Sequence, residues 1–93
     1  MFLLDVGQDR GALVLYAPSD LKDEEVEISF VDGEATPKKV HTGVVARKVN
    51  GRMVCAAVFP SLKAGEYTFW RPAPPPQPGF QITAGQVVEL DWR

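Results

Sequence analysis

The sequence predicts an all-β domain, a sandwich of two sheets built from seven or eight strands. Short runs of β-branched, aromatic and aliphatic residues alternate with Gly, Pro, Asp and Asn, a pattern typical of strands and turns. No segment keeps an amphipathic period of 3.6 over about ten residues, the minimum for a helix in such a domain. The strands recur about every ten residues, which favours a sandwich.

One domain, residues 1–93, accounts for the whole chain, because 93 residues have room for a single core. Apolar residues make up 45% of the chain and charged residues 24%, so the composition is that of a globular protein. The formal net charge of −2 gives no electrostatic reason to expect nucleic acid as a partner.

The N-terminal residues Met1 to Asp5 lack a basic region, and their apolar stretch ends at Asp5. A signal peptide needs an apolar stretch of about 7–15 residues, and a membrane span needs about 20. We therefore expect a cytoplasmic protein with no membrane partner. The single cysteine, Cys55, has apolar neighbours and is expected to be a buried thiol.

Three strands are expected in the first third of the chain, at Phe2–Val6, Gly11–Ala17 and Glu25–Val31. In the third, Val26, Ile28 and Phe30 share one face and polar residues share the other, so this strand has one buried side. We expect Phe30 to join one core with Val26, Ile28, Leu62, Tyr67, Phe69 and Leu90.

A long hairpin is expected next, with arms Val40–Val49 and Arg52–Phe59 around the Asn50-Gly51 turn. Asn-Gly is the preferred pair for a type I′ turn, which needs positive φ at both positions. The second arm is apolar on both faces and ends at Pro60. Because a sandwich covers one face of a strand, the face of Val54 and Val58 needs a second cover, either the proline-rich loop or another copy of the chain. We expect a homodimer that uses this face.

Three further strands are expected toward the C-terminus. Glu66–Trp70 precedes a proline-rich loop, Arg71–Gly79, and the strands Phe80–Thr83 and Gln86–Trp92 form a final pair joined through Ala84-Gly85.

The segment from Val58 to Phe69 has the features of a corner between two sheets. A proline follows a strand, Leu62 fills the core, Gly65 permits a tight bend, and Tyr67 can bond its hydroxyl back to the loop. This F-x-x-L-x-x-G-x-Y pattern resembles prealbumin-like domains, including carboxypeptidase regulatory domains and the B-type repeats of collagen-binding adhesins. The resemblance implies a Greek-key sandwich and no particular function.

The C-terminal strand, from Gly85 to Trp92, also resembles a group of short stand-alone bacterial proteins that have no well-defined activity. Adhesin repeats often join a Lys to an Asn covalently. Asn50 is the only asparagine here and lies in a turn, so we expect no such bond.

Catalytic chemistry is not expected. The only histidine, His41, has three serines as candidate nucleophiles, and none lies in a G-x-S-x-G turn. In the expected hairpin, Cys55 faces Ala46 and His41 faces Pro60, which disfavours a Cys-His pair. A hydrolase that uses His41 is kept as a remote alternative.

Neither a cofactor nor a metal is expected, because one His and one Cys cannot form a closed zinc site. The acidic residues Asp20, Asp23, Glu24 and Glu25 lack the spacing of a calcium loop and are expected to form a solvated loop. A basic group is expected to gather at one end of the hairpin, where charge protects a strand edge; it comprises Lys38, Lys39, Arg47, Lys48 and Arg52.

The function predicted is that of a non-catalytic interaction or accessory module, binding a protein partner or a second copy. The alternative is a module that binds carbohydrate or another small molecule with exposed tryptophans. The proline-rich loop is expected to be stiff and extended. The residues predicted for the interaction surface are Trp70, Arg71, Pro74, Pro75, Pro76, Trp92, Val54 and Val58.

Overall fold

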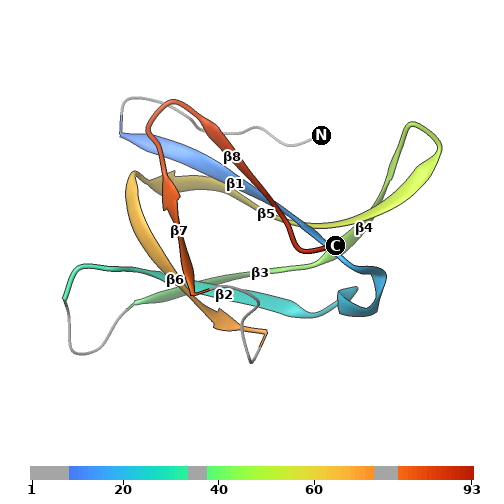
Figure 1. Ribbon diagram of the computed structural model, residues 1–93, viewed down its shortest axis with the longest axis horizontal. Coiled ribbons are helices and arrows are strands. Elements are labelled where there is room, and N and C mark those ends of the chain that lie inside the picture. Colours follow the sequence, from blue (N-terminus) through green and yellow to red (C-terminus); the bar gives the residue numbers. More distant parts are fainter. Residues whose placement is uncertain (1–8, 34–37, 73–77) are drawn as a thin grey trace.

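The computed structural model describes residues 9–33, 38–72 and 78–93, which form two four-stranded sheets packed face to face (Figure 1). Sheet A has the strand order β4-β5-β1-β8, and sheet B has the order β3-β2-β6-β7. The prediction of an all-β sandwich is confirmed at this level. The elements are β1 Arg10–Ala17, the 3₁₀ turn η1 Ser19–Leu21, β2 Glu25–Phe30, β3 Lys39–Gly43, β4 Val45–Val49, β5 Arg52–Lys63, β6 Gly65–Arg71, β7 Gly79–Ile82 and β8 Val87–Asp91. The strand expected at Phe2–Val6 lies outside the described residues.

The core lies between the two sheets and takes side chains from both. Leu13 and Leu15 of β1 are fully buried, as are Val26 and Ile28 of β2. Of the seven side chains predicted for this core, Phe30 and Leu90 are partly buried against it and the other five are buried within it. The alternation read from β2 therefore gave the correct register, since a shift by one residue would turn the charged face inward.

The Asn50-Gly51 hairpin is confirmed. Asn50 has φ 52° and Gly51 has φ 79°, the two positive values that a type I′ turn needs. The strands β4 and β5 pair in antiparallel fashion, and Cys55 lies opposite Ala46 as expected.

The first arm of this hairpin is shorter than expected, because residues 40–49 belong to two sheets. Lys39–Gly43 pairs with β2 in sheet B, and Val45–Val49 pairs with β5 in sheet A. The chain changes sheets at Val44, which is 1% exposed and whose N–H donates to the Glu24 carbonyl. As a result His41 lies opposite Glu27, and the expected pairing with Pro60 is wrong.

Two other expectations about strand ends are also wrong. Pro60 does not end β5, which continues to Lys63 through an irregular register opposite Gly11 and Leu13, where proline's missing N–H is tolerated. The last two strands do not pair with each other. β7 pairs with β6 in sheet B, whereas β8 pairs in parallel with β1 in sheet A.

The corner between β5 and β6 carries the chain from sheet A to sheet B within a few residues. β5 ends at Lys63 and β6 begins at Gly65. The Tyr67 hydroxyl donates to the Lys63 carbonyl at 2.8 Å, and Tyr67 is 4% exposed. The predicted tyrosine corner is thus confirmed in its hydrogen bond and its burial. The ring also contacts Phe30 edge-on and stacks on Phe80, each with centroids 5.4 Å apart.

Replacing Gly65 should destabilise the fold. Its φ of 144° is unfavourable for other residues, and a Cβ there would overlap the Phe30 ring. We expect Gly65→Ala to lower the free energy of unfolding by about 2–3 kcal/mol, from backbone strain and overlap together. Gly33→Ala is the matched control, because Gly33 has φ +81° but nothing within 4 Å of a Cβ. Denaturant titrations should show a loss of about 1 kcal/mol for this control; equal losses would contradict the overlap.

Tyr67→Phe should also destabilise the protein, by about 1–2 kcal/mol, because it leaves the Lys63 carbonyl without its donor in a part-buried place. Tyr16→Phe is the control, since the Tyr16 hydroxyl donates to Glu89 in an exposed position. Its loss should be much smaller. Burial also raises the pKa of Tyr67 above its usual 10.0. A group whose pKa is raised in the folded state stabilises the fold below pH 10, and this stabilisation is lost as the pH rises through the folded-state pKa. The difference in free energy of unfolding between wild type and Tyr67→Phe should therefore narrow above pH 10.

Candidate functional site

The β4–β5 hairpin extends beyond the sandwich. β1 pairs with β5 only as far as Cys55, opposite Ala17, so from Val54 to the turn β5 pairs with β4 alone. Figure 1 shows the tip of this hairpin curving away from the rest of the sandwich at one end of the molecule. The hairpin is long enough to project because β5 has 12 residues and β1 has 8.

Exposed apolar side chains gather on this hairpin. Val45 is 48% exposed, Val49 49% and Met53 67%, and Met53 is the most exposed large apolar residue in the described part of the chain. Val49 lies beside Arg52 on one face, and Met53 lies opposite Lys48 on the other. The projecting arm therefore offers apolar groups on both faces, where a sheet that covers only a core would have polar ones.

Basic side chains accompany them. Lys48 and Arg52 are exposed and Arg47 is half-buried. We call Val45, Arg47, Lys48, Val49, Arg52 and Met53 the hairpin surface. The other two members of the predicted basic group, Lys38 and Lys39, lie elsewhere. Lys39 is opposite Ser29 at the start of β3, at the far end of that strand from the hairpin, and Lys38 precedes it (Figure 1). The single basic group expected from the sequence is divided in two, because β3 and β4 belong to different sheets.

The outer face of β5 is less open than expected from its apolar sequence. Val58 is 9% exposed and Ala56 4%, while Val54 is half-buried. Val58 lies opposite Val14, and Ala56 lies opposite Tyr16 on β1. Lysine at Val58 would therefore disturb the fold itself. The exposed valines of this sheet lie at its two edges instead, Val45 and Val49 on β4 and Val87 on β8.

Polar side chains cover the rest of this outer face of sheet A, along β1 and β8. Tyr16 donates to Glu89 at 2.8 Å, and the Arg93 guanidinium lies 5.0 Å from the Tyr16 ring. The hydrogen bonds from Arg93 lower the pKa of the Asp91 carboxyl to about 2. The Tyr16 pKa is raised, first by its hydrogen bond to Glu89. These groups limit the exposed apolar area of sheet A to β4, the hairpin and the edge residue Val87.

Trp70 lies on the outer face of sheet B and is held there by two contacts. Its indole N–H donates to the Ser29 hydroxyl at 2.9 Å, and Lys39 Nζ lies 4.2 Å from the ring centroid. The ring remains 39% exposed, beside a hollow of about 230 Å³ lined by Ser29, Thr68 and neighbouring residues. Arg71, the next residue, is exposed, and its guanidinium lies 3.9 Å from Glu27.

Trp92 does not belong to the same surface. It is partly buried against the core, with its ring 5.0 Å from that of Phe69. The eight residues predicted for the interaction surface are therefore separated: Trp70 and Arg71 lie on sheet B, Val54 and Val58 lie on sheet A, and Trp92 lies between them. Pro74, Pro75 and Pro76 fall outside the described residues.

His41 and Cys55 lie on different sheets and differ in exposure. His41 is exposed on sheet B, and its Nδ1 lies 3.0 Å from a Glu25 oxygen. Cys55 is 8% exposed in the core of sheet A. Ser29 is occupied by its hydrogen bond to Trp70. His41 and Glu25 form an exposed contact of a kind suited to acid-base chemistry, and neither Cys55 nor Ser29 lies beside it as a nucleophile.

The acidic loop lies at the base of the hairpin. The Asp23 N–H donates to the Val44 carbonyl, and the Val44 N–H donates to the Glu24 carbonyl, which fixes this loop to the point where β3 passes into β4. Asp23, Glu24 and Glu25 line a hollow of about 400 Å³ with Arg71 and Pro72. Within residues 9–33, 38–72 and 78–93, no three His, Cys, Asp or Glu side chains are grouped to hold a metal ion.

Comparison with known protein families, with curated proteins and with solved structures finds no match for this chain. In the described part of the chain, no helix combines the length and apolarity needed to cross a bilayer.

The hairpin surface was only partly predictable. The Asn-Gly turn located the hairpin, and the basic residues beside it were visible. Its projection was missed, because β1 length and the change of sheet at Val44 depend on pairing between distant segments. A signal was present in Gly43-Val44, where a glycine interrupts an otherwise continuous strand pattern.

The two tryptophans should differ in their effect on stability. Trp92→Ala removes a ring packed on Phe69 and should lower the free energy of unfolding by about 3 kcal/mol or more. Trp70→Ala removes a half-exposed ring and one hydrogen bond, so we expect a loss of about 1–2 kcal/mol. Chemical denaturation followed by circular dichroism measures both. A larger loss for Trp70→Ala would contradict the assignment of Trp92 to the core.

Proposed function

We propose that this protein is a non-catalytic interaction module that binds a protein partner through the hairpin surface. The observation that carries the proposal is the exposure of Val49 and Met53 on the projecting arm, with the exposed Val45 at its base. Aromatic residues, Met and Arg are enriched at protein interfaces, and Met in particular adapts to different partners. Contact with a partner would remove this apolar area from water.

The anchoring of the hairpin favours the same function. An isolated two-stranded hairpin is marginally stable in water, but here β5 continues into the sandwich, where Ala57 and Phe59 are buried. The sandwich thus anchors the arm, and such anchoring lowers the entropy lost on binding. Burying Val49 and Met53 completely would contribute about 1–3 kcal/mol each.

The alternative, a module for carbohydrate or another small molecule, would depend on Trp70 alone. Lys39 lies over its ring and its N–H is bonded to Ser29, so stacking of a sugar would have to displace Lys39 or use the remaining exposed edge. The hairpin surface requires no such rearrangement, and we therefore favour a protein partner.

We also propose a more specific fold type for this sandwich. We assign the sandwich to the Greek-key, prealbumin-like type on the sequence pattern of the β5–β6 segment. The tyrosine corner at Tyr67 supports this assignment, as does the division into two four-stranded sheets. Such domains serve many roles, so the argument for function rests on the hairpin surface.

A photo-crosslinking residue tests the proposed function. We expect Met53 replaced by a photoreactive amino acid to give discrete crosslinked protein in an extract of the native cells. The same replacement at Gln81, which is exposed on β7 of sheet B, should give none. Val49→Lys should reduce crosslinking from position 53. Equal crosslinking from positions 53 and 81, or none from either, would contradict the proposal.

A further inference from the structure

The charges of this chain are divided between two parts of the sequence. Residues 38–65 contain six Lys and Arg residues and no Asp or Glu, whereas all twelve acidic residues lie outside this range. The formal net charge of −2 does not reveal this separation, because the opposite charges largely cancel over the whole chain. The fold turns the separation along the sequence into a separation in space, because the hairpin formed by β4 and β5 projects with three of these cations.

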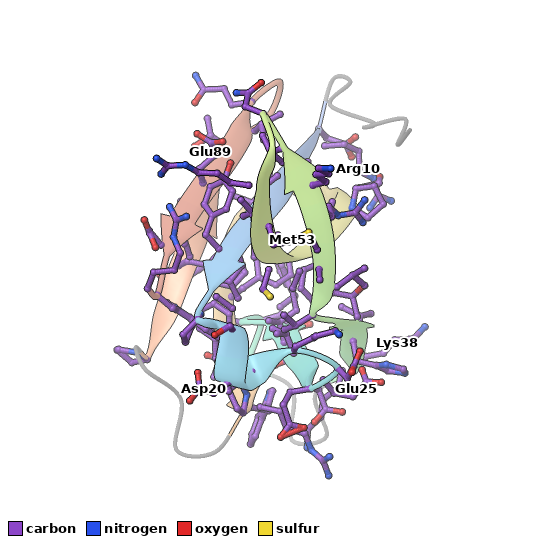
Figure 2. The ribbon with its side chains drawn as sticks, turned by 90° about the vertical axis from the view of Figure 1, so that its right-hand side faces the viewer. Arg10, Asp20, Glu25, Lys38, Met53 and Glu89 are labelled. Atoms are coloured by element: carbon purple, nitrogen blue, oxygen red, sulfur yellow. The ribbon has the colours of Figure 1, made fainter. Side chains whose placement is uncertain are left out.

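The acidic residues nearest the hairpin form a second patch at the same end of the molecule. Asp20, Asp23, Glu24 and Glu25 are all exposed, and we call them the acidic patch. The two backbone hydrogen bonds to Val44 fix this patch at the root of β4. Figure 2 looks onto this end of the molecule and shows the hairpin with Met53 above and Asp20 and Glu25 below.

The two patches do not neutralise each other within one chain. In the part of the chain that the structure describes, Lys48 and Arg52 form no ion pair with an acidic group. The hairpin curves away from the acidic patch (Figure 1). Apart from the contact between Glu25 and His41, each patch is thus available to a molecule that carries the opposite charge.

We propose that the partner of the hairpin surface is a second copy of this chain, whose acidic patch receives the hairpin. This inference rests on the proposed function and names its partner. A two-fold axis between two such ends places the hairpin of each copy against the acidic patch of the other, so both contacts form at once. Self-complementary contacts of this kind are the commonest arrangement in soluble homo-oligomers.

Charged and apolar side chains contribute differently to this contact. Lys48 and Arg52 of one copy face carboxylates of the other, which favours this orientation over like-charge alternatives and speeds association. Val49 and Met53 supply the apolar area that becomes buried. Charge pairs at the edge of a contact are screened by salt, so this dimer should weaken as the salt concentration rises.

Sedimentation velocity on the purified full chain tests the proposal. We expect a concentration-dependent dimer in about 0.05 M salt and at least a tenfold weaker one in about 0.5 M salt, where the Debye length is roughly a third as long. A chain that stays monomeric up to about 1 mM in low salt would overturn self-association, because a dissociation constant above that value corresponds to less than about 4 kcal/mol.

Charge reversal identifies the two patches. The hairpin variant Lys48→Glu/Arg52→Glu and the acidic-patch variant Asp20→Lys/Glu24→Lys should each be folded and monomeric. An equimolar mixture of the two should form a heterodimer, because the native hairpin of one variant meets the native acidic patch of the other, while the reversed hairpin meets a patch in which the two new lysines offset Asp23 and Glu25. The controls Lys38→Glu/Lys63→Glu and Glu66→Lys/Glu89→Lys carry the same charge changes away from both patches and should dimerise like the wild type.

The outcomes also separate this inference from the proposed function. A mixture that stays monomeric, or a wild-type dimer that both variants preserve, would overturn the pairing of hairpin and acidic patch. If the purified chain is monomeric but position 53 crosslinks to a different protein in the extract, self-pairing is wrong and the interaction module stands. If position 53 crosslinks to nothing, both are wrong.

Discussion

The rest of the structure depends on the corner between β5 and β6, which the Tyr67 hydroxyl closes by donating to the Lys63 carbonyl. This hydrogen bond holds the corner where the chain leaves sheet A and enters sheet B, so it sets how the two sheets face each other. The same ring stacks on Phe80, which brings β7 into the core. Gly65 makes this possible, because only a residue without a Cβ leaves space for the Phe30 ring. One corner thus couples backbone geometry, aromatic packing and sheet orientation.

A second consequence of the sandwich is the unequal length of its strands. β5 is long because it serves two purposes: from Cys55 to Lys63 it pairs with β1 and supplies side chains to the core, and from Arg52 to Val54 it pairs with β4 alone. Apolar residues in the part paired with β1 stabilise the fold. In the projecting part, the apolar Met53 is 67% exposed. The same strand therefore supplies both core and binding surface, and the boundary falls near Cys55.

The positions of the tryptophans show how the fold limits function. Both end a strand in the sequence, yet Trp92 closes the core against Phe69 while Trp70 lies outside on sheet B. The two do not form one aromatic surface, since Trp92 packs on Phe69 at the core while Trp70 lies on the outer face of sheet B. The hairpin surface remains exposed, and its basic side chains are separated from the acidic patch. Such a surface suits protein contact, where complementary charges select the orientation and apolar area supplies affinity.

The sequence by itself determined the local features of this protein. Alternation placed Val26 and Ile28 inward, Asn50-Gly51 specified a hairpin, and the spacing from Gly65 to Tyr67 specified a corner, because each depends on neighbouring residues and on φ values that few residues adopt. Only the tertiary structure decided which strands pair. Val44 divides an apparently continuous strand between two sheets, and β8 joins β1 across most of the chain length. Such pairings depend on the free energy of the whole core, so the projecting hairpin and the separation of the predicted surface residues could not be read from local pattern.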